Sequence, residues 1–96
     1  MSPINKKKLN ILRKKLDNLD NSFIKLVKKR TSIVKKVLQL KENKNQIVDK
    51  KRIKFILNQV RKKSIRNKID PKITNRIWKN MIWSYINFER RNFKKK

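Results

Sequence analysis

The sequence predicts an all-α protein with three helices, and three observations lead to this fold class. Apolar residues recur at alternating spacings of three and four over the first 40 residues, which is typical of a long helix. The Asp-Pro pair at 70–71 marks the start of another helix, because Asp caps a helix and Pro fits its first turn. No segment has the alternating pattern of a strand. A chain of 96 residues allows one small domain, 1–96, and we place its core at about 9–92 and a basic tail at 93–96.

The first predicted helix runs from about residue 6 to about residue 42. Its apolar seam has ten positions, and a single arginine interrupts it: Leu9, Leu12, Leu16, Leu19, Phe23, Leu26, Arg30, Ile33, Val37 and Leu40. This helix is roughly 55 Å long at about 1.5 Å per residue. A chain this short cannot bury such a seam against its own remainder alone. The seam therefore predicts a partner subunit.

Two shorter helices follow a polar loop at 42–48. Asp49 is a good N-cap for a helix over about 50–65, and a break is expected at 66–68. The helix that starts at Asp70 and Pro71 runs to about residue 92. The buried stripe of the second helix comprises Ile53, Ile56, Leu57 and Val60. The third helix carries two neighbouring stripes, which are Ile73, Ile77, Met81 and Phe88, and Trp78, Ile82, Tyr85 and Glu89.

The composition excludes several classes of function. The chain contains no Gly, no Cys and no His. Disulfides, the usual zinc sites, a Ser-His-Asp triad and Gly-rich phosphate loops are therefore excluded. We expect no metal and no cofactor. Neither a signal segment nor a run of about 18 apolar residues is visible, so we expect a cytoplasmic protein without a membrane span.

The strongly basic charge has two explanations. The chain has 31 Lys and Arg against 6 Asp and Glu, a formal net charge of +25, which favours binding to nucleic acid. A bias toward the AT-rich codons of Lys, Asn and Ile accounts for most of the surface lysines without a nucleic-acid partner. The basic residues are spread along the chain, and no DNA-reading motif is present. We expect no specific nucleic acid, and a basic helical dimer that coats DNA or RNA remains an alternative.

Three charged residues stand where helix physics does not favour them, and a fourth shares a helix face with one of them. Arg30 interrupts the apolar seam, and Lys41 follows eleven residues later on nearly the same face. Arg52 lies in the first turn of its helix, where the helix dipole disfavours a cation. Glu89 is a lone acid in an aromatic and apolar stripe. Snorkelling or surface ion pairs explain each one singly, whereas a bound anion explains the cations together.

Arg13 and Lys41 share one column of the first predicted helix, four heptads apart. They are about 40 Å apart along a straight helix, so they cannot meet within one chain. They can meet in a two-fold dimer whose long helices run antiparallel. An antiparallel homodimer would therefore bring these two cations together across its chains. A purely structural coiled coil is an alternative, but it leaves Arg30 and this column unexplained.

Short motifs occur in a fixed order along the chain. An L-R-x-x-[IL]-D-x-[IL]-D motif lies at 12–20 and an [IL]-[LV]-x-x-R motif at 26–30. Lys41 follows that arginine by eleven residues, a D-x-x-R motif lies at 49–52, and an aromatic stretch ending in an acid spans 78–89. The order and spacing of these motifs resemble the all-helical class of chorismate mutase, type II.

The resemblance implies an intertwined homodimer of three-helix chains with two equivalent sites. It also implies an isomerase that converts chorismate to prephenate for Phe and Tyr biosynthesis, without metal or cofactor. The implied partner is a small dianionic substrate, chorismate. The related isochorismate pyruvate lyases share the fold, so lyase activity is a second implied function.

The resemblance assigns catalytic roles to Lys41, Glu89 and Arg30. Arg30 and the other subunit's Arg13 would each bind a substrate carboxylate. Lys41 would donate to the ether oxygen and to a carboxylate. Glu89 stands where the family often has a Gln that donates to the same oxygen. Because a carboxyl group donates only when it is protonated, the role of Glu89 at neutral pH stays open.

The remaining substrate-binding residues surround the start of the second helix. The resemblance implies that Asp49 and Arg52 line the substrate there. Three positions depart from the family pattern. Ile53 replaces a Glu that contacts the substrate hydroxyl, Tyr85 stands where Ser or a small residue is common, and Glu89 replaces Gln.

Overall fold

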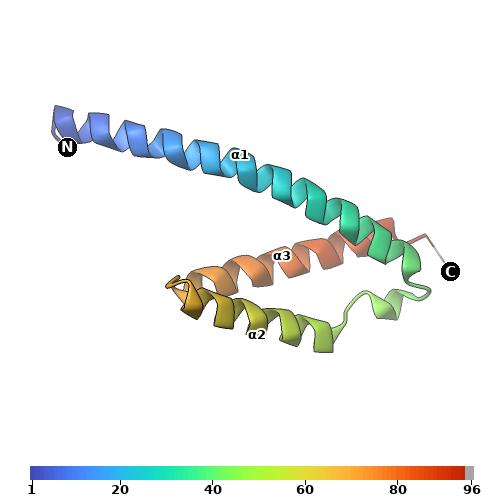
Figure 1. Ribbon diagram of the computed structural model, residues 1–96. Coiled ribbons are helices and arrows are strands. Elements are labelled where there is room, and N and C mark those ends of the chain that lie inside the picture. The colour runs from blue at the N-terminus through green and yellow to red at the C-terminus, as the bar shows by residue number, and fades with distance from the viewer. Residues whose placement is uncertain (95–96) are drawn as a thin grey trace. The chain divides into compact units, whose positions relative to one another are not determined.

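A computed structural model describes residues 1–94, which form three α-helices and one short 3₁₀ helix (Figure 1). The order is α1 (Pro3–Leu40), η1 (Lys44–Gln46), α2 (Lys50–Arg66) and α3 (Pro71–Asn92). No strand occurs in this described part of the chain. The predicted all-α class is confirmed. The last two residues of the expected basic tail, 95 and 96, lie outside the described residues.

α1 begins earlier and ends earlier than the sequence predicts. The hydroxyl of Ser2 accepts a hydrogen bond from the N–H of Asn5 at 3.2 Å, and Pro3 suits the first turn, so the helix begins at Pro3. At the other end, the N–H of Lys41 donates to the carbonyl of Leu38 at 3.1 Å. This i→i−3 bond tightens the last turn and closes the helix just before Lys41.

The chain divides into two compact units, and the first is Met1–Ile33. It consists of the larger part of α1. The predicted seam is exposed here, because six of its side chains are between 52% and 65% accessible: Leu12, Leu16, Leu19, Phe23, Leu26 and Ile33. A single helix with an exposed apolar seam is marginal in water. The exposure agrees with the expectation that the chain alone does not bury this seam.

The second unit, which starts at Val34, combines the last turns of α1 with η1, α2 and α3. α2 and α3 lie side by side, as Figure 1 shows. The end of α1, the segment after η1 and the C-terminal half of α3 supply the buried core, which consists of Leu38, Ile47, Ile82 and Ile86. Partly buried residues of α2 pack against this core, namely Ile53, Ile56 and Leu57. The core therefore joins the end of α1 to α3.

Asp residues cap both shorter helices, as predicted. A carboxylate oxygen of Asp49 accepts from the N–H of Arg52 at 3.0 Å, and one of Asp70 accepts from the N–H of Lys72 at 2.9 Å. Between these helices, Lys68 adopts a φ of 55°, in the left-handed region that turns the chain. These signals place α2 and α3 within a residue of the predicted bounds.

Packing differs from the sequence pattern at two places. Ile47 lies in the segment predicted as a polar loop, yet it is 3% exposed because η1 turns its side chain onto the core. In α3, Ile86 belongs to neither predicted stripe and is 4% exposed, whereas Ile73 is 56% exposed. The apolar residues of α3 are numerous enough to fit more than one face. Contact with Leu38 and Ile47 selects the face that contains Ile86.

Candidate active site

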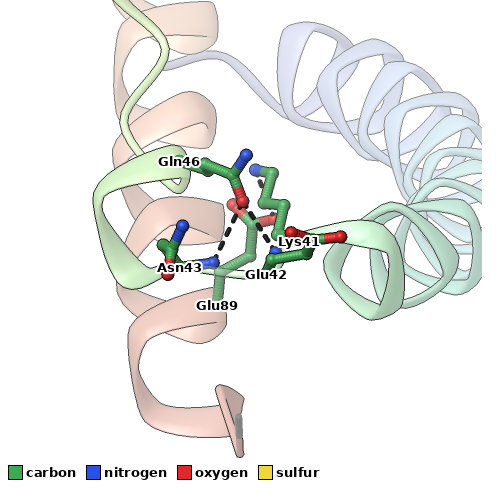
Figure 2. Close-up of polar contacts among 5 residues, drawn as sticks. All are labelled: Lys41, Glu42, Asn43, Gln46 and Glu89. Atoms are coloured by element: carbon green, nitrogen blue, oxygen red, sulfur yellow. Dashed lines mark hydrogen bonds and ion pairs between the residues drawn. The ribbon is translucent and has the colours of Figure 1, made fainter. Parts of the chain in front are cut away.

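Lys41 and Glu89 form an ion pair in the second unit (Figure 2). Nζ of Lys41 lies 3.0 Å from Oε1 of Glu89, although 48 residues separate them in sequence. The two side chains are only 19% and 7% exposed. A largely buried charge pair gains little net stability, because both charges lose their hydration. Its presence at the end of α1 therefore points to a functional role for these side chains.

The core positions both members of this pair. Lys41 follows the buried Leu38 by three residues, and Glu89 follows the buried Ile86 by three residues. Three residues are about one helical turn, so each charged side chain lies about one turn beyond a core contact. The packing that fixes the end of α1 on α3 thus also fixes the distance between the ammonium and carboxylate groups.

The η1 turn holds the backbone that follows Lys41. Oε1 of Gln46 accepts hydrogen bonds from the N–H groups of Glu42 at 2.7 Å and Asn43 at 3.0 Å (Figure 2). Lys41 is therefore held by α1 on one side and by the η1 turn on the other. No predicted motif includes Gln46. Its signal was an Asn followed three residues later by a Gln, a spacing similar to that of a capping box.

A pocket of about 410 Å³ opens beside Lys41. Its walls are partly apolar, and its lining consists of Val37, Leu40, Lys41, Asn45, Gln46, Val48 and Asp49. The volume is within the range of small-molecule sites. The polar part of this lining consists of the Lys41 ammonium group, the side-chain amides of Asn45 and Gln46 and the Asp49 carboxylate. A mixed lining of this kind suits a small ligand that has both charged and apolar parts.

The predicted D-x-x-R motif forms the first turn of α2. Asp49 caps the helix through the N–H of Arg52, so these two residues lie together. The guanidinium carbon of Arg52 lies 5.3 Å from the centroid of the Phe55 ring, a cation–π contact that orients the side chain. Ile53 is half-buried and packs against the core. Ile53 therefore supplies no polar group at this point.

The other predicted site residues divide between the two units. Arg13 and Arg30 lie on α1 within Met1–Ile33, and both are exposed. Tyr85 lies on α3, about one turn before Glu89, and is half-buried. Of the predicted site residues in the second unit, Lys41 and Glu89 form an ion pair with each other.

The described residues show no donor set for a metal. Within residues 1–94, no group of three His, Cys, Asp or Glu side chains is placed to hold a metal ion. In the same residues, no helix combines the length and the apolar character needed to cross a membrane.

Comparison with known proteins identifies one family. The family model described as chorismate mutase type II matches residues 12–90. No curated protein and no solved structure matches the chain. The matched residues span most of the chain and contain all eight predicted site residues, from Arg13 to Glu89. The chain therefore belongs to the chorismate mutase type II family.

Proposed function

We propose that this protein is a chorismate mutase that converts chorismate to prephenate in the biosynthesis of Phe and Tyr. Membership of the family supports this proposal. The observation that carries it is the Lys41–Glu89 pair, 3.0 Å apart. Lys41 itself lines a pocket of about 410 Å³. The pocket has room for a small dianion, and its polar wall carries the charge that a carboxylate needs.

The reaction suits a chain without Gly, Cys or His. Chorismate rearranges within one molecule, as a C–O bond breaks and a C–C bond forms. The enzyme supplies no nucleophile and no cofactor. Negative charge grows on the ether oxygen in the transition state, so donors that are already oriented there lower the barrier more than they stabilise the substrate.

Lys41 is the first such donor in this proposal. Its ammonium group donates to the ether oxygen and to a neighbouring carboxylate. Glu89 is the second donor, in its protonated form. The ion pair holds both side chains at the site before substrate arrives.

A second copy of the chain completes the site in this proposal. The exposed seam of α1 is apolar over many turns, and a partner's α1 running antiparallel would cover it. In that dimer, the partner's Arg13 binds one substrate carboxylate and Arg30 of the same chain binds the other. Asp49, Arg52 and Tyr85 line the remainder of the site, and Ile53 supplies an apolar contact.

A chorismate assay tests the proposal. Wild-type protein should form prephenate, and Lys41→Ala should lose about a hundredfold in rate, roughly 3 kcal/mol, because one donor to the developing charge is missing. Arg30→Ala should also lose activity. Lys36→Ala is the matched control, since Lys36 is an exposed lysine near the end of α1, five residues before Lys41. Equal rates in all four proteins would overturn the assignment.

The aliphatic side chain at position 53 supports isochorismate pyruvate lyase as a second candidate. Those lyases resemble this chain in having an aliphatic residue at this position, and Ile53 is occupied with the core. The products separate the two activities. Isochorismate should give salicylate and pyruvate with a lyase, whereas a mutase gives prephenate from chorismate.

A further inference from the structure

We propose that Gln46 is a substrate-binding residue whose side-chain amide NH₂ donates to a carboxylate of the anion bound by Lys41. The proposal rests on the proposed mutase function and adds a residue to its site. Gln46 comes from η1, outside every motif that suggested the function. Its assignment depends on the orientation of its amide and on its place in the pocket lining.

The hydrogen bonds of Gln46 fix the orientation of its amide. Two backbone N–H groups, those of Glu42 and Asn43, donate to the same side-chain atom, so that atom must be the oxygen. The nitrogen then lies on the opposite branch of the amide. Within residues 1–94, Nε2 of Gln46 has no hydrogen-bond partner and keeps both of its N–H donors. The amide is therefore an oriented donor.

This donor faces the same pocket as Lys41. Gln46 and Lys41 both line it, and Figure 2 shows the amide nitrogen of Gln46 on the side of the Lys41 ammonium group. The Lys41 ammonium group donates to Oε1 of Glu89, and an ammonium group has three N–H donors, so it can also donate to a ligand. A ligand carboxylate oxygen placed between Lys41 and Gln46 accepts from both side chains.

The rest of the lining agrees with a ligand that is charged at one end. Val37, Leu40 and Val48 form apolar walls that suit a carbon ring. Asp49 is the acidic group in the lining, and it accepts from the N–H of Arg52 at the start of α2. The charge of Asp49 is thereby stabilised by the helix it caps. The Lys41–Gln46 side of the pocket is left to bind the carboxylate.

Gln46→Glu separates the two functions of this side chain. A glutamate keeps an acceptor oxygen for the N–H groups of Glu42 and Asn43, but it has a second carboxylate oxygen in place of the NH₂ group that would donate to the substrate. Asn43→Asp is the charge control, because it adds the same charge in the same turn outside the pocket lining. We expect Gln46→Glu to raise KM for chorismate about tenfold above Asn43→Asp, with an unchanged melting temperature. Equal KM values in these two variants would overturn the proposal.

Gln46→Met completes the test, because it removes the acceptor and the donor without adding a charge. We expect the same rise in KM, together with a lower melting temperature from the lost turn contacts. A lower melting temperature with an unchanged KM would show that Gln46 only closes the turn, and would overturn the proposal. Wild-type protein that leaves chorismate unchanged would overturn the mutase function itself. An active wild type with a silent Gln46→Glu would overturn only the assignment of Gln46.

Discussion

Lys41, directly after α1, and Glu89, on α3, are joined by an ion pair of 3.0 Å. Each stands three residues beyond a buried core residue, Leu38 in one case and Ile86 in the other. The geometry of the pair is therefore a consequence of core packing. Any change that moves the end of α1 on α3 also moves the ammonium group away from the carboxylate.

Substitution of Glu89 by Gln tests whether the carboxyl group acts as a donor. A glutamic acid donates only when it is protonated, and the protonated fraction falls as pH rises. If Glu89 is the donor, the wild-type kcat/KM falls with rising pH between about pH 5 and pH 8. Glu89→Gln donates at every pH and should keep its activity with a flat profile. The measurement is kcat/KM for chorismate across this range in both proteins.

Two outcomes would contradict this role of Glu89. One is a flat wild-type profile, since a titrating donor must produce a slope. The other is a Glu89→Gln variant that is inactive at every pH although folded. Glu42→Gln is the matched control, because Glu42 is an exposed glutamate beside Lys41 whose side chain is not assigned to the site. Its profile should follow that of the wild type.

The ion pair also makes a prediction about stability. Lys41→Met leaves the buried carboxyl group of Glu89 without its cation, which should lower the free energy of unfolding by about 2 kcal/mol. Adding Glu89→Leu to Lys41→Met removes the orphaned group and should restore most of that loss. Chemical denaturation of the wild type, the two single variants and the double variant, at one fixed protein concentration, measures this double-mutant cycle. Additive effects of the two substitutions would mean that the pair is not coupled.

Local signals in the sequence predicted the helices well. The first residues of α2 and α3 were predicted from single residues that favour a helix start, namely Asp49, Asp70 and Pro71. The long heptad seam likewise needs only its own spacing to predict α1. These features depend on neighbours in the chain, so the sequence contains all that is needed to find them.

The packing inside the second unit was harder to predict, because it depends on contacts between distant segments. In the sequence, Ile47 is one of two apolar residues in a polar loop, and only the η1 turn brings it into the core. The pairing of Lys41 with Glu89 required the family resemblance, since no local pattern links residues 48 positions apart. Gln46 lies outside the family motifs, and only the capping-box spacing from Asn43 signalled its role in the turn. The two hydrogen bonds that its side chain accepts close a loop, and a loop has no repeating apolar pattern from which its path could be predicted.

The exposed seam predicts how the chain responds to a charge at its centre. Leu19 is 65% exposed in the single chain, so Leu19→Lys should be harmless to a monomer. If a second copy covers the seam, a buried charge there should convert the dimer to a monomer, lower its helix content and abolish mutase activity. Sedimentation equilibrium and circular dichroism measure the first two effects. Asn21→Lys adds the same charge at an exposed position off the seam and should leave all three unchanged.

Sharing of the site between chains is tested by mixing two inactive variants. In the proposed dimer, Arg13→Ala removes the arginine that one chain contributes to its partner's site, and Lys41→Ala removes the donor in the chain's own site. In a mixed dimer, one site has lost both residues and the other has lost neither. Random exchange makes about half of the dimers mixed, and each contains one intact site of two, so the mixture should regain about a quarter of wild-type activity.

The mixing experiment needs proof that the subunits have exchanged. A tagged copy of one variant should co-purify the untagged other variant after brief partial unfolding and refolding of the mixture. With exchange shown, a mixture that stays as inactive as its components would mean that Arg13 and Lys41 act in the same chain or not at all. The control pairs Lys41→Ala with Glu89→Ala, two changes on the same side of the site. Every mixed dimer then has one substitution in each site, so this mixture should stay inactive even when the first mixture recovers.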